Sequence, residues 1–76
     1  MSGRLPSMSA REVVRAFERA GFQVVPARGK GSHITMARDD WPAILVIPSH
    51  GEVRRGTLRA LLRQSGLTVE QFLELR

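Results

Sequence analysis

Apolar residues recur at helical spacing in the segment that begins near residue 9. Ser9 and Glu12 have the Ser-x-x-Glu spacing of a capping box, in which each side chain accepts a hydrogen bond from the backbone amide of the other residue. The apolar residues behind this cap follow the i, i+3, i+4, i+7 spacing of one helix face: Ala10, Val13, Val14 and Phe17. We therefore expect a helix that begins after Ser9 and ends at Gly21, because glycine readily adopts the left-handed conformation of a C-terminal cap.

The middle of the chain has the composition and spacing of short β-strands. Three apolar or alternating segments are separated by turn-forming residues, at positions 22–27, 32–38 and 43–48. The intervening turns have the sequences Arg28-Gly29-Lys30-Gly31 and Asp39-Asp40-Trp41-Pro42. Because the connections are short, we expect the three segments to form an antiparallel meander.

The alternation of side chains divides the second and third strands into two faces. Ile34 and Met36 share the face of the second strand that is expected to meet the helices. The opposite face of that strand carries His33, Thr35 and Ala37. The third strand is apolar on both faces over residues 44–47, so we expect a loop or another protein to cover its outer side.

Two further helices are expected in the last third of the chain. The first ends at Gly66 and has one apolar face, made of Leu58, Leu61 and Leu62. Thr68 and Gln71 have capping-box spacing and predict a last short helix. The resulting order, α-β-β-β-α-α, predicts an α+β fold with a three-stranded antiparallel sheet covered on one face by helices. We expect residues 1–8 to form a flexible tail and residues 9–76 a single domain.

The balance of charges indicates a negatively charged partner. Lys and Arg together number 12 and Asp and Glu number 7, which gives a formal net charge of +5 over 76 residues. Such an excess of cations on a small domain is typical of proteins that bind a polyanion such as nucleic acid. The sequence shows no export signal and no apolar segment of the roughly 20 residues that span a membrane, so we expect a cytoplasmic protein without a membrane partner.

The absence of cysteine narrows the possible chemistry. Without Cys, the chain has no disulfide, no thiolate zinc site and no cysteine nucleophile. The segment Gly29-Lys30-Gly31-Ser32 lacks the spacing of a phosphate-binding loop, and a strand rather than a helix is expected after it. His33 and His50 are not accompanied by a recognised pattern of metal ligands. We therefore expect no metal and no small-molecule cofactor.

His33 is the residue best suited to chemistry without a metal. An unperturbed histidine titrates near pH 6.5, so it can take up and return a proton at neutral pH. A general base beside a ribose 2′-hydroxyl can drive its attack on the adjacent phosphorus and leave a 2′,3′-cyclic phosphate, while Arg28 or Lys30 offsets the charge of the transition state. Ser32 would support the turn or the substrate. DNA lacks this hydroxyl and should resist cleavage. A histidine with a purely structural role, or one that is only exposed to solvent, would cleave neither RNA nor DNA.

Four sequence blocks resemble those of a known family. They are Ser9-x-x-Glu12 with Ala20-Gly21-Phe22, then Gly31-Ser32-His33, then Ile47-Pro48-Ser49-His50, and then Gly56-Thr57-Leu58-Arg59 followed by residues 61–67. In their order and spacing the blocks resemble the HicA (YcfA-like) mRNA interferase toxins, over nearly the whole chain from about Leu5 onward. The turn over residues 39–42 departs from the short glycine-containing turn that is usual in the family.

This resemblance implies a fold like that of double-stranded-RNA-binding domains, ribosome-independent cleavage of mRNA, and neutralisation by a HicB antitoxin encoded beside the toxin. It places the family's essential histidine, the one in Gly-Ser-His, at His33. His50 matches a frequent Pro-x-His feature, and we expect it to pack the loop or to contact RNA. Arg55 and Arg59, with Arg63, recur at i+4 spacing after this loop and are candidates to bind phosphate or the antitoxin. The expected RNA contacts are Arg28, Lys30, Ser32, His50, Arg55 and Arg59.

Two other classes of function fit parts of the sequence. A non-catalytic RNA-binding module would use His33 only to hydrogen-bond the RNA backbone or its 2′-hydroxyl groups. A protein-interaction subunit would use the two-sided apolar third strand and would not bind RNA. Trp41 has two interpretations as well, because a turn aromatic either stacks on a base or anchors its own hairpin.

Overall fold

The computed structural model describes residues 5–26 and 32–76, so the expected turn that contains Arg28 and Lys30 lies outside the described residues. The elements run in the order β1 (Met8–Ser9), α1 (Ala10–Arg19), β2 (Gln23–Val24), β3 (His33–Arg38), β4 (Trp41–Pro48), β5 (Glu52–Val53), α2 (Arg55–Ser65) and α3 (Val69–Leu75). The expected α-β-β-β-α-α order is confirmed. The strands β1 and β5 are additions to it that the sequence did not predict.

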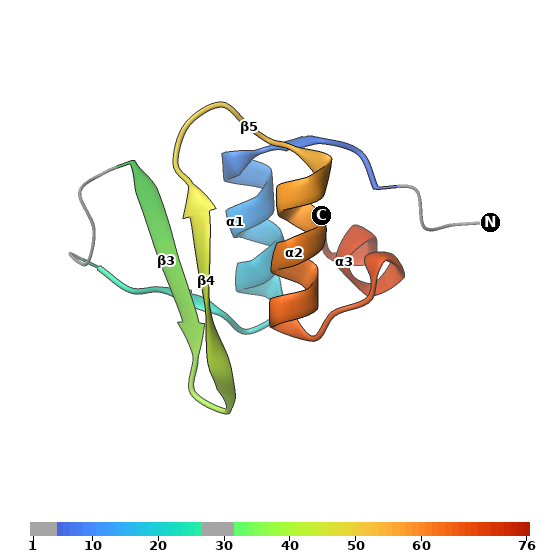
Figure 1. Cartoon of the computed structure of the whole chain (residues 1–76). Coiled ribbons are helices and arrows are strands. Elements are labelled where there is room, and N and C mark those ends of the chain that lie inside the picture. The colour runs from blue at the N-terminus through green and yellow to red at the C-terminus, as the bar shows by residue number, and fades with distance from the viewer. Residues whose placement is uncertain (1–4, 27–31) are drawn as a thin grey trace.

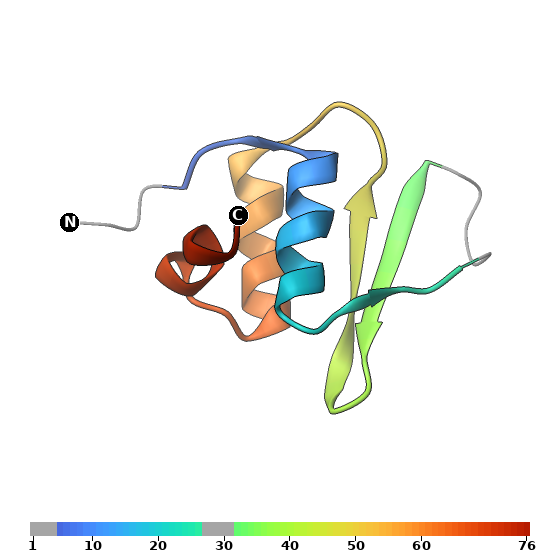
Figure 2. The ribbon, with the colours of Figure 1, turned by 180° about the vertical axis from the view of Figure 1, so that it is seen from behind.

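The helices lie on one side of the main sheet. This sheet is three-stranded and antiparallel, with the strand order β2-β3-β4. Figures 1 and 2 show α1 and α2 against the sheet, and α3 packed on these two helices on the side away from the strands. The α+β class and the single covered face are therefore confirmed, with one refinement: the third helix packs on the other helices and not on the sheet.

The ends of α1 follow from its cap residues. The Ser9 hydroxyl accepts a hydrogen bond from the Glu12 amide at 3.1 Å, and the Glu12 carboxylate accepts one from the Ser9 amide at 3.1 Å. At the other end, Gly21 has a φ of +102° and donates its amide to the Glu18 carbonyl at 3.0 Å. The helix therefore begins and ends as the sequence predicts, since each end supplies partners for backbone groups that have none within the helix.

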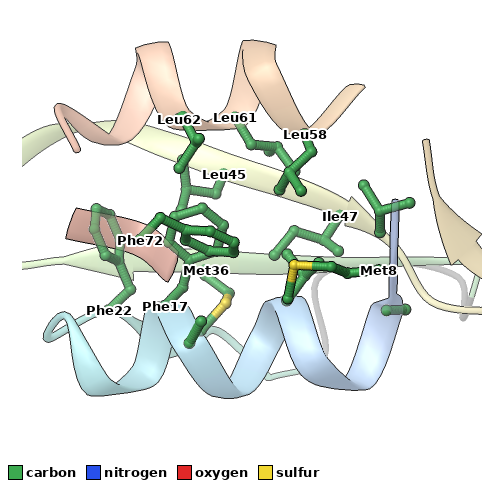
Figure 3. Close-up of a cluster of buried hydrophobic side chains, with 14 of the residues drawn as sticks. Met8, Phe17, Phe22, Met36, Leu45, Ile47, Leu58, Leu61, Leu62 and Phe72 are labelled. Carbon is green, nitrogen blue, oxygen red and sulfur yellow. The ribbon is translucent and has the colours of Figure 1, made fainter. Parts of the chain in front are cut away.

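Three phenylalanines in the core come from α1, from the residue just before β2, and from α3. The Phe17 ring meets Phe22 edge-on, with 5.8 Å between the ring centroids, and lies 5.1 Å from Phe72 in a tilted arrangement. Figure 3 shows this cluster between the helices and the sheet, and the residues that extend it are Met36, Leu45, Ile47, Leu58, Leu61 and Leu62. Because the same core contains residues of α1, α2, α3, β3 and β4, packing here fixes how the sheet sits on the helices.

The first described residues are part of the core, and the prediction of a flexible tail over residues 1–8 is wrong for residues 5–8. Leu5 is 0% exposed and Met8 is 2% exposed. Met8 also pairs with Val53, so that β1 and β5 form a two-stranded antiparallel ribbon. A strand of two residues has too short a pattern to be recognised from sequence, and its partner lies more than 40 residues away along the chain.

Trp41 is not in the turn where the sequence placed it. The turn comprises Asp39 and Asp40 only, and Trp41 and Pro42 begin β4. The pairing of β3 with β4 is irregular between Met36 and Arg38, and an irregular stretch of strand is one of the places where proline is tolerated. Trp41 anchors the hairpin to α2, because its indole Nε1 donates to the Gln64 carbonyl at 2.7 Å.

Arg38 fastens the same end of the hairpin to α1. Its guanidinium donates to the Asp40 carboxylate at 2.6 Å and to the Ala20 carbonyl at 3.0 Å, and it lies 5.8 Å from the centroid of the Phe22 ring. The hydrogen bond from Arg38 lowers the pKa of Asp40 below its ordinary value. The pair therefore stabilises the fold above the ordinary pKa of aspartate, and this contribution is lost as the pH falls through the lowered value.

We expect Gly66→Ala to destabilise the protein by about 2 kcal/mol, because two penalties combine at this position. Gly66 has a φ of +80°, and a Cβ there would lie 2.8 Å from Cζ2 of Trp41. The change is measured as the free energy of unfolding in urea. Gly56→Ala is the matched control in the same helix, since a Cβ at Gly56 meets nothing within 4 Å and alanine is the better helix former. Equal effects of the two substitutions would contradict this account.

Candidate functional site

His33 stands at one end of the sheet with its side chain exposed. It is the first residue of β3, and its side chain is on the face of the sheet away from the helices, as the alternation predicts. Its Nδ1 lies 3.3 Å from the Ser32 hydroxyl oxygen. When Nδ1 carries the proton and donates it to Ser32, Nε2 keeps a free lone pair and can accept a proton from a bound molecule.

The turn after β4 lies against the start of β3. Pro48 is the cross-strand partner of His33, and the Ser49 amide donates to the Ser32 carbonyl at 3.1 Å. The other end of the turn is fixed to α1, because the Ala10 amide donates to the Gly51 carbonyl at 3.0 Å. His50 therefore projects from a segment held on both sides, one residue beyond the pairing with β3, and it is exposed.

Gly51 is a site residue that the sequence reasoning missed. Its φ of +72° lies in the left-handed region, where residues with a side chain are strained. This conformation lets the chain turn directly after His50 and bring the Gly51 carbonyl to α1. The signal was a glycine directly after the Pro-Ser-His segment, at the point where the chain has to leave the sheet.

Arg55, the first cation of α2, lies on the helical side of the molecule. Arg55 lines a shallow pocket of about 370 Å³ together with Leu5, Leu73 and Arg76, on the flank of α2 that faces α3. Arg59 follows one turn later and is exposed. The structure thus brings Ser32, His33 and His50 to one end of the sheet and leaves Arg55 on the helical side of the molecule.

The N-terminus of α2 carries positive charge without a side-chain cap. Arg54 occupies the N-cap position, where no side chain caps the helix, and the first turn contains no acidic residue. The amides at the start of a helix add a partial positive charge to that of the neighbouring side chains. This end of α2 therefore favours anions.

The face of the sheet that extends from His33 is apolar. Thr35 pairs with Val46, and both lie on the side away from the helices. Ile44 is 54% exposed and Val46 50% exposed, whereas Leu45 and Ile47 are buried completely. The expectation that β4 is apolar on both faces is confirmed, and no described element covers its outer side (Figures 1 and 2).

Residues 5–26 and 32–76 contain no group of three or more His, Cys, Asp or Glu side chains that could hold a metal ion. Within the same ranges, every helix is too short or too polar to cross a membrane.

Comparison with known proteins assigns the chain to a family. No curated protein matches it significantly. The family model described as the HicA toxin of bacterial toxin–antitoxin systems matches residues 10–67. The matched segment begins with α1, passes through the sheet, His33 and His50, and ends just after α2. Since it includes most of the chain and both candidate histidines, the chain belongs to the HicA toxin family of bacterial toxin–antitoxin systems.

Proposed function

We propose that this toxin is a metal-independent endoribonuclease that cleaves mRNA in the cytoplasm, with His33 as its general acid–base residue. The observation that carries the proposal is the position of His33, which is exposed at the start of β3 with its Nδ1 3.3 Å from the Ser32 hydroxyl and with the His50 turn beside it. A histidine placed in this way can exchange protons with a bound molecule without any metal.

The reaction that suits one histidine uses the RNA as its own nucleophile. His33 takes the proton of a ribose 2′-hydroxyl, the 2′-oxygen bonds to the adjacent phosphorus, and the bond from phosphorus to the 5′-oxygen breaks. The products are a 2′,3′-cyclic phosphate and a 5′-hydroxyl. The leaving 5′-oxygen takes its proton from the protonated His33, from Lys30, from His50 or from water.

RNA would be held by polar contacts near His33 and by more distant cations. Ser32 and His50 are on the same end of the sheet as His33. Arg28 and Lys30 lie four and two residues before Ser32 in the sequence and are proposed to bind the phosphate at the cleavage site. Arg55 and Arg59, at the positive end of α2, would contact phosphates farther along the strand, because RNA backbone contacts are spread over a basic surface.

Neutralisation is proposed to come from a HicB-type antitoxin. The family is that of toxin–antitoxin systems, so a protein partner is part of its biology. A partner that covers the end of the sheet would keep RNA from His33, and acidic side chains would strengthen its binding to a toxin with a net charge of +5.

Cleavage of a short RNA in excess EDTA tests the proposal. We expect full activity with the chelator, products that end in a 2′,3′-cyclic phosphate, and no cleavage of the same oligonucleotide with a 2′-deoxy group at the scissile position. The intact RNA is the matched control for the deoxy substrate. Loss of activity in EDTA would contradict the metal-free mechanism. RNA binding without cleavage would instead identify a non-catalytic RNA-binding module.

A further inference from the structure

Among the described residues, no strand pairs with the outer edge of β4, and the composition of this edge is unusual. β4 is the last strand in the order β2-β3-β4, and its eight residues include no charged side chain. Edge strands present free amides and carbonyls to any chain that can pair with them, and soluble proteins usually protect such edges with charges, bulges or prolines. On β4 these protections stand at its two ends: Pro42 and the irregular pairing opposite Met36–Arg38 at one end, and Pro48 at the other.

The hydrogen-bond pattern identifies which groups point outward. The Val25 amide donates to the Thr35 carbonyl at 2.8 Å, so the main-chain groups of Thr35 are directed toward β2. Val46 is the cross-strand partner of Thr35. In an antiparallel pair, the main-chain groups of two such opposed residues point away from each other, so those of Val46 point to the free edge. The pairing with β3 becomes irregular beyond Leu45, but the alternation of exposed and buried side chains continues to Ile44, which places it on the same face as Val46.

The same two residues also present the exposed apolar side chains. Ile44 is 54% and Val46 50% exposed on the face away from the helices. Pro42 and Pro48 have no amide hydrogen, which confines pairing to residues 43–47. This window therefore offers backbone pairing at its edge and an apolar contact on its adjoining face. Recognition by strand addition uses this combination of backbone hydrogen bonds and side-chain contacts.

From these features we infer that an extended strand of the antitoxin pairs with residues 43–47 of β4 and rests its apolar side chains on Ile44 and Val46. RNA is a poor occupant, because this part of the face carries no cation that could bind phosphate. A second copy of the toxin is disfavoured because both copies carry a net charge of +5. A partner with the opposite charge meets no such repulsion, and the family supplies a protein partner.

The proposed docking edge of β4 extends to the candidate site, so a docked strand would affect access to His33. His33, the first residue of β3, lies opposite Pro48, the last residue of β4. A strand added along β4 would therefore end close to His33 and bring the rest of the antitoxin over it. The docking site rests on the geometry of β4 and on membership of the family, and only this consequence for His33 rests on the proposed function.

Amide hydrogen exchange tests the pairing in the unaltered protein, with the cognate antitoxin of this toxin as the probe. In the free toxin we expect fast exchange at Ile44 and Val46 and slow exchange at Leu45 and Ile47, whose amides face β3. Adding the antitoxin should slow exchange at Ile44 and Val46 at least 100-fold. Leu45 and Ile47 serve as controls within the same strand. Unchanged exchange at Ile44 and Val46 in the complex would overturn strand addition.

Substitutions test the same surface through affinity for that antitoxin. Val46→Pro removes the outward amide, and Ile44→Thr with Val46→Thr removes apolar surface while keeping β-branched side chains. We expect each variant to weaken binding at least tenfold and to leave the rate of RNA cleavage within twofold. Val24→Thr is the matched control at the opposite edge of the sheet, where Val24 is 42% exposed, and it should bind like the wild type.

The remaining outcomes separate the alternatives. Unchanged antitoxin affinity in the threonine double variant, whose melting temperature shows that it is folded, would overturn the docking site. Weaker RNA binding in that variant would make the face an RNA surface, and a toxin dimer dissociated by Val46→Pro would assign the edge to a second copy. Either result would overturn the inference. A wild-type toxin that binds the antitoxin through β4 but does not cleave RNA would refute the proposed function alone.

Discussion

Replacement of His33 by alanine should lower the rate of RNA cleavage by about 10²- to 10⁴-fold, the range that general acid–base catalysis contributes. The melting temperature should hardly change, because the side chain is exposed and its one described side-chain partner is the neighbouring Ser32. Affinity for RNA should stay within a few-fold of the wild type, since the proposed phosphate contacts are made by other residues. Single-turnover cleavage, RNA binding and thermal unfolding measure these three quantities.

Variants of the neighbouring polar residues provide the controls for this result. His50→Ala removes the other histidine at the same end of the sheet and should weaken RNA binding more than it slows the chemical step. Ser32→Ala removes the hydroxyl beside Nδ1 of His33 and should lower the rate less than the loss of the ring does. Cleavage by His33→Ala at the wild-type rate would refute the proposed role. A loss of RNA binding equal to the loss of cleavage would indicate a binding residue.

Local rules explain why most of the fold could be predicted from the sequence. Each helix end expected from a Ser-x-x-Glu, Thr-x-x-Gln or glycine signal is present, because caps involve residues only a few positions apart. The faces of β3 and β4 followed from strict alternation, which also placed His33 on the exposed side. These features depend on backbone geometry and on neighbouring residues, so they are visible without the rest of the protein.

Contacts between distant segments explain what the sequence did not reveal. The β1–β5 ribbon joins residues that are far apart in the chain, and each of its strands is two residues long. Trp41 was placed in a turn because of the adjacent aspartates and proline, whereas its position is set by a hydrogen bond to Gln64 on α2. Such pairings depend on how helices and sheet pack together, and single-sequence patterns carry little information about that packing.

The candidate site was predicted in composition but only partly in arrangement. Ser32, His33 and His50 lie at one end of the sheet because β3 begins where β4 ends, which the predicted meander already implied. Arg55 was grouped with them because it closely follows the same loop in the sequence. The β5 strand carries the chain to the helical side of the molecule before Arg55 begins α2, so proximity in sequence did not become proximity in space.

Leu5→Ala should destabilise the protein by about 3 kcal/mol, although Leu5 lies in a segment whose sequence resembles a flexible tail. The side chain is 0% exposed and belongs to the same core as Met8 and Val53, so its loss leaves a cavity in that core. A domain of this size has a total stability of about 4–11 kcal/mol, and the melting temperature should fall by roughly 12–24 °C. Urea unfolding and calorimetry measure the change.

Ser7→Ala is the matched control, because Ser7 is exposed and its one described hydrogen bond, to Glu52, is long at 3.4 Å. A Leu5→Ala variant as stable as Ser7→Ala would show that Leu5 does not support the core, and the structural role assigned to this residue would have to be abandoned.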